Sequence, residues 1–330
     1  MPWGVGEWPG NNRLTMRTIY LDNESGALTR PVVATVGFFD GVHLGHQYLV
    51  RQVVDRAHTL GLESMVITFD RHPRSVLRQD FQPQLLTPLD EKLRLLGRTG
   101  VDVVVVLRFD KVMAMLSARR FMDEVLRVRL CVQQLIIGYD NRFGHDRAES
   151  FDDYARYGRE IGMQVTHASA YVVDGIEVSS SVVRAFLHEG EVTLAARCLG
   201  RDYTLYGWVS DGYKEGRKLG YPTANLDVSR IGQLIPGNGV YAVKARVGSA
   251  SRSMPAMTNI GMRPTFAGHE RTVETHIFDF SENIYDQRLD LSFVRRVRSE
   301  RKFEDVNALV DQLKQDEKEI EKILKENGFE

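Results

Sequence analysis

The chain has few of the features that mark several large classes of protein. Its two cysteines, Cys131 and Cys198, stand alone rather than in a Cys-x-x-Cys pair, so neither a zinc site nor a redox couple is predicted. The net charge of −1 provides no field that would attract nucleic acid or anionic lipid. The sequence has no apolar run of membrane-spanning length and no basic segment leading into an apolar one at its start. We therefore expect a cytoplasmic protein without a nucleic-acid or membrane partner; the residues indicate no oligomeric state.

The composition is that of an ordinary globular protein with room for two domains. The 330 residues are 43% hydrophobic and 26% charged, and no repeat or low-complexity tract interrupts them. Residues 1–15 are rich in Gly, Trp, Pro and Asn without periodicity, so we expect them to be unstructured, with Met16 as a candidate start. A change of pattern near Gly190 predicts one domain over 16–190 and a second over 191–330.

The first half alternates strand-like and helix-like stretches. Val101–Leu107 is continuously apolar apart from Asp102, which favours a parallel strand buried on both faces. Strands are predicted at 31–39, 65–69, 101–109 and 134–139, and helices at 90–98, 117–130 and 150–161. Ser150 and Asp153 have the spacing of a capping box at the start of the last helix. The pattern is typical of a doubly wound α/β domain, in which ligands bind beyond the carboxyl ends of the strands.

The second half changes to short alternating strands. Two short helices are predicted at 180–188 and 191–199, followed by strands at 203–210, 240–247, 253–259, 272–280 and 287–296. A small antiparallel barrel closes such strands without exposed edges. Apolar residues from Val306 to Leu324 then recur on one face of a helix that ends at Asn327-Gly328.

Two histidines, His43 and His46, flank Gly45 where a predicted strand passes into a helix. Such a turn directs backbone N–H groups and the positive end of the helix dipole toward a bound anion. Gly37, Gly41 and Gly45 let the backbone approach a phosphate closely. Two imidazoles at this position predict nucleotidyl transfer, because they can stabilise charge on an attacked α-phosphate. The alternative is that both are ordinary polar residues of a loop.

Three further segments of the first half place polar groups at strand ends or before a helix. They are Thr68–Arg74, Ile137–Gly144 and Val178–Arg184, the last with three serines before Arg184. Each alone fits an ordinary surface loop, whereas together they predict a nucleotide pocket.

In the second half, Thr223 and Asn225 are spaced by two, which puts both on one face of an extended segment. A hydroxyl and an amide oxygen suit a magnesium ion that also binds nucleotide phosphates. Glu274 shares a strand face with His276 and is a candidate base for an attacking hydroxyl. The alternative for Glu274 is a simple ion pair with Arg263 or Arg271. The glycines near 216 form no P-loop pattern.

From about Met16 onward, the chain resembles the bacterial bifunctional riboflavin kinase/FAD synthetase family. The motifs F-D-G-V-H-L-G-H-Q, T-F-D-x-H-P-R, G-x-D-x-R-F-G and S-S-S-x-x-R match its adenylyltransferase module in order. The motifs L-G-Y-P-T-A-N-L, P-G-N-G-V-Y-A, N-I-G-M-R-P-T-F and V-E-T-H-I-F-D-F match its kinase module. The resemblance implies a Rossmann-like nucleotidyltransferase domain, then a six-stranded antiparallel barrel with a C-terminal helix. It implies synthesis of FMN from riboflavin and of FAD from FMN, each with ATP and Mg²⁺.

The resemblance also implies roles for residues at matching positions. His43 and His46 would contact ATP phosphates during adenylyl transfer, and Glu274 would be the base for the ribityl hydroxyl. The remaining ATP contacts of the first module would be Gly37, Phe39, Asp40, Gly45, Asp140, Ser180, Ser181 and Arg184. The flavin contacts there would be Phe69, Asp70, His72 and Pro73. The kinase would bind ATP through Gly216, Gly220, Pro222, Thr223 and Asn225, the last two also holding the metal.

This sequence departs from the family pattern at three positions. Phe38 stands where many members have Asn, Arg71 where Pro is common, and Glu215 where a basic residue is frequent. Glu215 reverses a charge near the nucleotide loop, so kinase affinity is the property it affects. Other readings are a kinase with an inactive or regulatory first domain, a cytidylyl or pantetheine-phosphate adenylyl transferase, and a flavin- or nucleotide-sensing protein without turnover.

Overall fold

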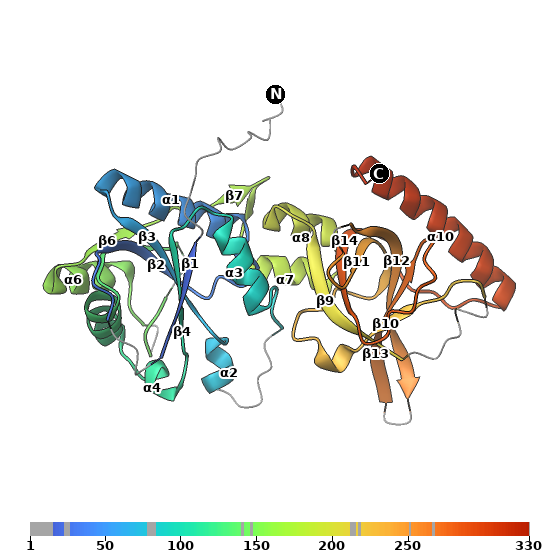
Figure 1. Cartoon of the computed structure of the whole chain (residues 1–330), viewed down its shortest axis with the longest axis horizontal. Helices are drawn as coiled ribbons and strands as arrows, with labels where there is room; N and C mark the ends of the chain where they lie inside the picture. The colour runs from blue at the N-terminus through green and yellow to red at the C-terminus, as the bar shows by residue number, and fades with distance from the viewer. Residues whose placement is uncertain are drawn as a thin grey trace. The chain divides into compact units, whose positions relative to one another are not determined.

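The structure is a computed structural model that describes residues 16–22, 27–77, 84–139, 142–145, 148–211, 216, 219–250, 252–265 and 268–329. The expectations for residues 1–15, Asp140 and Glu215 lie outside these ranges. The described chain forms two compact units (Figure 1). The first unit contains residues 16–38, 46–77 and 89–169. The second contains 170–329 together with two segments from earlier in the chain, 39–45 and 84–88.

The first unit is built on a parallel sheet of six strands in the order β1-β4-β3-β2-β5-β6. Its strands are β1 (Arg17–Leu21), β2 (Val32–Val36), β3 (Glu63–Phe69), β4 (Val103–Leu107), β5 (Val132–Ile137) and β6 (Gln164–His167). Every neighbouring pair is parallel. Counted from β2, the strand order is that of a doubly wound sheet, which reverses between β2 and β5. The predicted fold class is confirmed.

Both faces of the central strands β2, β3 and β4 are buried, which explains why these strands are largely apolar. One face packs on the π-helical segment η2 (Phe121–Arg129) and on α6 (Phe151–Ile161). Thr68 faces the other side, where Lys92 of α3 (Leu89–Gly97) contacts it. The remaining helices of this unit are α1 (Leu44–Leu60), which begins in the second unit, α2 (Pro73–Leu77), α4 (Lys111–Ala114) and α5 (Ala118–Arg120).

Some predicted elements differ in length or type. The strand expected at 101–109 is limited to Val103–Leu107. The helix expected at 117–130 divides into α5 and η2, where the Leu130 N–H donates to the Val125 carbonyl at 3.0 Å, five residues back. Apolar spacing could not separate these forms, because both bury the same side of the segment. The capping box of Ser150 and Asp153 is confirmed.

The second unit begins with the small β7–β8 hairpin (Val172–Val173, Ile176–Glu177) and the helices α7 (Ser180–His188) and α8 (Val192–Leu199). A closed barrel follows, in the order β10-β13-β12-β11-β14-β9. Its strands are β9 (Tyr203–Ser210), β10 (Ala224–Leu226), β11 (Gly239–Val247), β12 (Met254–Thr265), β13 (Gly268–Ile277) and β14 (Arg288–Arg298). All its pairs are antiparallel, as predicted. β12 continues to Thr265, beyond the predicted end at 259.

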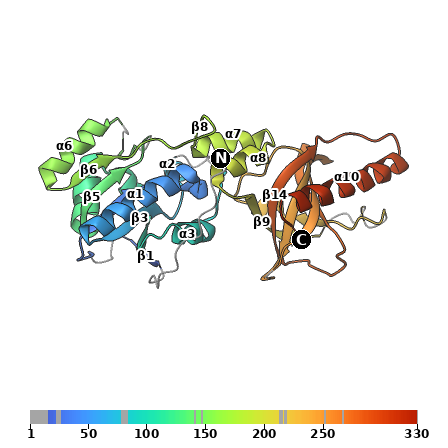
Figure 2. The same cartoon turned by 90° about the horizontal axis from the view of Figure 1, so that it is seen from above.

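The C-terminal helix α10 (Val306–Glu326) covers part of the outer surface of the barrel (Figures 1 and 2). Its apolar side packs on outward-facing residues such as Ala242 and Met257. Asp316, buried within this contact, accepts hydrogen bonds from Arg298 of β14 at 2.7 to 3.1 Å. The helix ends at Asn327, as predicted.

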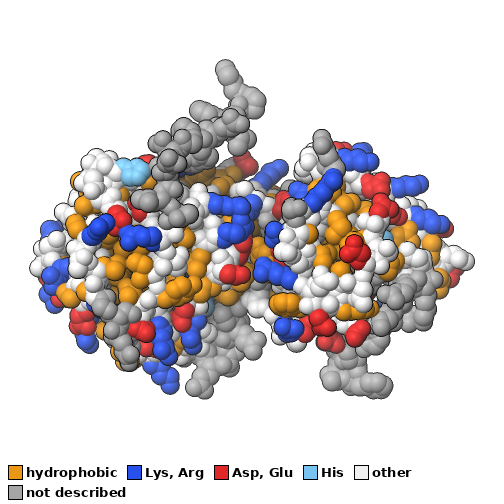
Figure 3. Space-filling model, viewed as in Figure 1, with side chains coloured by type: hydrophobic (Ala, Val, Ile, Leu, Met, Phe, Trp, Pro, Cys, Tyr) orange, Lys and Arg blue, Asp and Glu red, His pale blue; other side chains and the backbone are white. Residues whose placement is uncertain are grey.

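Charges of both signs are mixed on the face shown in Figure 3, as the net charge of −1 leads one to expect. Within the described ranges, no helix is both long and apolar enough to cross a lipid bilayer.

Candidate active sites

The segment after β2 forms a tight turn with unusual backbone geometry. Gly37 donates its N–H to Ile67 of β3 at 3.0 Å, which ends the strand. Phe39, Gly41 and Val42 then adopt left-handed backbone, with φ of 55°, 82° and 40°, around the short turn η1 (Asp40–Val42). Such backbone in Phe and Val is costly and persists only where neighbouring contacts hold it. Helix α1 begins directly after His43, so the turn presents this histidine at a helix N-terminus, as predicted.

His43 is buried, with 5% of its surface exposed. Burial lowers its pKa to about 3, with further lowering from the positive charges of Arg201 and Arg184. The imidazole is therefore neutral near pH 7 and has one N–H to donate. Its ring lies against Gly45, where an added Cβ would come within 3.2 Å of Nδ1. His46 lies in the first turn of α1.

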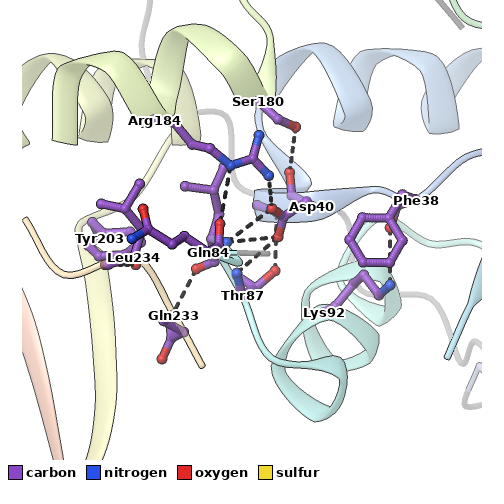
Figure 4. A network of polar contacts seen from close by, with 12 residues as sticks. Phe38, Asp40, Gln84, Thr87, Lys92, Ser180, Arg184, Tyr203, Gln233 and Leu234 are labelled. Atoms are coloured by element: carbon purple, nitrogen blue, oxygen red, sulfur yellow. Dashed lines mark hydrogen bonds and ion pairs between the residues drawn. The ribbon is translucent and has the colours of Figure 1, made fainter. Parts of the chain in front are cut away.

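Asp40 is the centre of a polar network in the second unit (Figure 4). Its carboxylate accepts hydrogen bonds from the N–H of Leu86 at 2.9 and 3.0 Å, and from that of Thr87 at 3.1 Å. Arg184 donates to the same carboxylate, while the Ser180 hydroxyl donates to the Asp40 carbonyl at 2.9 Å. The structure thus brings three predicted ATP-binding residues together, but by contacts with one another. Ser181 is exposed in the first turn of α7.

The segment after β3 supplies the candidate flavin contacts of the first unit. Phe69 is buried and meets Phe109 edge to face, with ring centroids 5.2 Å apart. Asp70 accepts the Phe109 N–H at 2.9 Å. His72 lies edge-on to Phe38, with ring centroids 4.8 Å apart, and Pro73 begins α2. Because β2, β3 and β5 are parallel, the segments that follow them leave the sheet at one edge, as predicted.

Lys92 is a residue that sequence reasoning missed. Only 2% of it is exposed, and its ammonium donates to the Phe38 carbonyl, the Thr68 hydroxyl and the Phe69 carbonyl at 3.0, 3.0 and 3.3 Å. The ammonium also lies 4.2 Å from the centre of the Phe38 ring. Lys92 therefore holds together the ends of β2 and β3. The one available signal was a lysine beside Leu93, Leu95 and Leu96 in a helical pattern.

In the barrel, Glu274 lies in the middle of a row of polar side chains. It pairs with Asn225 of β10 on one side and with Asn259 of β12 on the other, so all three share one face. Burial raises the pKa of Glu274, and the positive charge of Arg263 partly opposes this rise. Arg271, the other suggested partner, donates instead to the Pro236 carbonyl. A half-buried carboxyl with a raised pKa is a suitable proton acceptor.

The segment before β10 is held by His276, the neighbour of Glu274 on the same strand face. Its Nδ1 lies 2.8 Å from the Pro222 carbonyl oxygen, and its ring meets that of Tyr221 edge-on. Gly216 is in close contact with the Tyr221 carbonyl, where an added Cβ would approach to 2.3 Å. Gly220 has φ of +82°. These contacts hold the backbone of the segment that leads into Thr223 and Asn225.

Thr223 and Asn225 line separate cavities. Asn225 borders one of about 310 Å³ with Asp211 and Arg263, whereas Thr223 borders one of about 340 Å³. The strand begins only at Ala224, so the two-residue spacing does not by itself place both side chains in one strand. A larger cavity, about 860 Å³, lies where the end of β13 meets the last turns of α10. Its apolar lining includes Met254, Phe278, Phe280 and Phe329.

A doubly wound sheet that carries His43 in the turn before α1, together with a barrel that carries the half-buried Glu274, favours a transferase that acts on nucleotides at two sites. Comparison with known proteins agrees. Residues 26–182 match the FAD synthetase family and residues 199–324 match the riboflavin kinase family.

Curated relatives match both halves together. Bifunctional riboflavin kinase/FMN adenylyltransferases from Escherichia coli K12 and Pseudomonas fluorescens are 35% and 39% identical. The first alignment covers 90% of this chain and 94% of the relative, and the second covers 85% and 89%. A crystal structure described as a macrolide-efflux protein from Streptococcus pneumoniae has a TM-score of 0.82 at 31% identity, over 92% of this chain and 98% of that one. The chain belongs to the bifunctional riboflavin kinase/FMN adenylyltransferase family, with the FAD synthetase domain N-terminal and the flavokinase domain C-terminal.

Proposed function

We propose that the two activities of this family, riboflavin kinase and FMN adenylyltransferase, are divided in this chain between Glu274 and the His43 turn. Riboflavin and ATP would give FMN and ADP in the barrel. FMN and a second ATP would then give FAD and pyrophosphate in the α/β domain. The proposal rests on where the two groups lie. Glu274, the candidate base, lies in the segment that matches the riboflavin kinase family, and the buried, neutral His43 lies at a helix N-terminus in the segment that matches the FAD synthetase family.

In adenylyl transfer, a phosphate oxygen of FMN attacks the α-phosphorus of ATP, and the bond to the β-phosphate oxygen breaks. A neutral His43 donates a hydrogen bond to the α-phosphate without a charge, while His46 and the first N–H groups of α1 act on the same oxygens. Gly37 and Gly45 allow the close approach. The ATP roles of Phe39, Asp40, Asp140, Ser180, Ser181 and Arg184, like the flavin roles of Phe69, Asp70, His72 and Pro73, stay predictions.

In the kinase reaction, Glu274 takes the proton of the ribityl hydroxyl as its oxygen attacks the γ-phosphorus of ATP. Its raised pKa makes it a better proton acceptor than an ordinary surface glutamate. Gly216, Gly220 and Pro222 shape the segment that leads to Thr223 and Asn225, which we assign to ATP.

The donor atoms of Thr223 and Asn225 suit magnesium by their chemistry, although the two side chains border separate cavities. In the described ranges, no group of three or more His, Cys, Asp or Glu side chains could hold a metal. The Thr223 hydroxyl and the Asn225 amide oxygen are hard donors of the kind Mg²⁺ takes alongside nucleotide phosphates. We therefore propose that these two residues hold Mg²⁺ in the kinase site. When bound, the ion offsets phosphate charge. The expected cytoplasmic location stays a prediction.

Two single-site variants test the division. With FMN and ATP supplied, we expect His43→Ala to lose FAD formation by at least about a hundredfold, while FMN formation from riboflavin stays near that of the unchanged chain. Glu274→Ala should do the reverse. Product formation is followed by chromatography of the flavins, with ADP and pyrophosphate measured in the same samples.

Equal damage to both reactions by both changes would contradict the assignment of two sites. FAD formation without FMN formation, or the converse, in the unchanged chain would show that one half is inactive or regulatory. Flavin affinity without product in any form of the chain would indicate a sensing protein.

A further inference from the structure

Gln233 is a buried amide in the connection between β10 and β11 of the barrel, and it reaches a distant part of the sequence. Its Nε2 donates to the Thr204 carbonyl at 3.0 Å and to the Leu86 carbonyl at 3.1 Å. Its Oε1 accepts the Tyr206 N–H at 3.0 Å. Gln233 thus joins β9 of the barrel to a residue 147 positions earlier in the chain (Figure 4).

The segment that Gln233 holds is Leu85–Thr87, which we call the strap. The strap pairs with the barrel connection through Leu85, whose N–H donates to Gly232 at 3.2 Å and whose carbonyl accepts from Leu234 at 2.8 Å. Tyr203 donates its hydroxyl to the Leu234 carbonyl at 2.6 Å and fixes this connection to β9. Two backbone hydrogen bonds of Leu85 and the Gln233 amide therefore fasten the strap to the barrel, and the Tyr203 hydroxyl secures the connection to which it is fastened.

The other side of the strap holds the turn Phe39–Val42. Leu86, whose carbonyl accepts from Gln233, donates its own N–H to the Asp40 carboxylate through the two bonds at 2.9 and 3.0 Å. Thr87 adds a second tie, because its hydroxyl accepts the Gly41 N–H at 3.1 Å. The strap lies between Gln233 and the turn that precedes His43.

The turn depends on these contacts because its backbone is strained. Phe39, Gly41 and Val42 all have positive φ, and a conformation of this kind needs surrounding contacts to persist. The carboxylate of Asp40 and the N–H of Gly41, the two groups that the strap holds, lie inside this run. A shift of the strap would therefore move His43.

We propose that Gln233, a residue of the riboflavin kinase barrel, is a positioning residue for FMN adenylylation. It acts through the strap on Asp40 and through the turn on His43, and the inference rests on the proposed role of His43. A displacement of about 1 Å at a reacting group can lower a rate about a hundredfold. The expected effect is on kcat, because His43 is proposed to stabilise the charge that develops at the α-phosphate during the reaction.

The test uses the full-length Gln233→Leu variant, with both reactions measured in one preparation. We expect kcat for FMN adenylylation to fall about tenfold or more, with KM for ATP and riboflavin kinase activity within about twofold of the unchanged chain. The kinase reaction is an internal control for folding, because Gln233 belongs to the barrel that carries it. The Gln233→Glu variant keeps the acceptor for Tyr206 and removes the Nε2 donor to Leu86 and Thr204, so it should show the same loss in a side chain of equal size.

Two further variants sharpen the result. Thr258→Val removes a different buried hydrogen bond of the barrel, the 2.9 Å contact with Thr275, and should leave adenylylation unchanged. Thr87→Val removes the hydrogen bond that the Thr87 hydroxyl accepts from the Gly41 N–H. If Gln233 acts through the strap, the Gln233→Leu/Thr87→Val double variant should lose less than the product of the two single losses.

Adenylylation within twofold of the unchanged chain in both Gln233 variants would overturn the proposal, as would an equal fall in both reactions. His43→Ala is measured beside them. If His43→Ala keeps its adenylylation, the proposed function of the turn fails. If His43→Ala loses it and the Gln233 variants do not, only the present inference fails.

Discussion

At the scale of single residues, burial acts on the two proposed sites in the same physical way. It disfavours the charged form, so it raises the pKa of Glu274 and lowers that of His43 to about 3. The consequences for chemistry differ. Glu274 gains strength as a proton acceptor once it is ionised, whereas His43 becomes a hydrogen-bond donor that carries no charge near pH 7.

Arg263 offers a test of the charge balance at Glu274. Its guanidinium lowers a carboxyl pKa that burial raises, so Arg263→Gln should raise the pKa of Glu274 further. Because the base works only when ionised, kinase activity increases as pH rises through this pKa. We expect the acid limb of the kcat/KM profile to move to higher pH by up to about one unit. The measurement is riboflavin phosphorylation between pH 5 and 9.

Arg271→Gln is the matched control, because Arg271 donates to the Pro236 carbonyl and does not contribute to the pKa shift of Glu274. Its acid limb should stay in place. A profile for Arg263→Gln that moves to lower pH, or an equal shift in both variants, would contradict the assignment of Glu274 as the base.

Residue types and spacing identified the histidine pair and Glu274 as candidates, because those patterns are local, and the roles of these residues stay predictions. Asp40 shows the limit of such reasoning. Its place in a motif suggests a ligand contact, but the carboxylate faces the N–H groups of Leu86 and Thr87, 46 and 47 positions away. Lys92 and Gln233 were missed for the same reason, since their partners lie far along the chain.

At the scale of elements, hydrophobic periodicity predicted most strands and helices. It could not show where strained turns or π-helical segments lie. The strands of the barrel and the capping box of α6 follow from side chains close in sequence. The π-helical hydrogen bonding of η2 and the left-handed turn before α1 depend on packing against other elements.

Gly41 tests the turn as an element. It has φ of +82°, and an added Cβ would lie 2.8 Å from a methyl carbon of Leu86 in the strap. Gly41→Ala should therefore combine a left-handed backbone cost of about 1–2 kcal/mol with a steric clash, and should lower FMN adenylylation. Unfolding midpoints in urea and the rate of FAD formation are the measurements.

Gly61 at the end of α1 provides the comparison, because it also has positive φ, +65°, but no atom within 4 Å of an added Cβ. Gly61→Ala should be milder in stability and leave FAD formation unchanged. If Gly41→Ala and Gly61→Ala changed the unfolding midpoint and the rate of FAD formation equally, the contact between the turn and the strap would not contribute to FMN adenylylation.

At the scale of the whole molecule, the chain joins two reactions through a product that is also a substrate. FMN leaves one proposed site and enters the other, so each single-site variant should lack one step only. We expect a mixture of the His43→Ala and Glu274→Ala chains to convert riboflavin to FAD, with FMN appearing first. Time courses of the three flavins would show this lag.

Either variant alone, given riboflavin, should form no FAD. The two single-variant samples are therefore the controls for the mixture. Absence of FAD from the mixture, despite normal single reactions, would mean that FMN has to pass between sites within one chain.

The compact units do not follow the order of the sequence. Residues 39–45 and 84–88 are grouped with 170–329, although they come from the half of the chain that matches FAD synthetase. The predicted domain boundary between residues 190 and 191 therefore stays a prediction, made from the change of sequence pattern alone. A chimera that joins this N-terminal half to the kinase barrel of a relative would need a matching partner for Leu85–Thr87. The interchangeable part is thus larger than the stretch of gene that encodes the barrel.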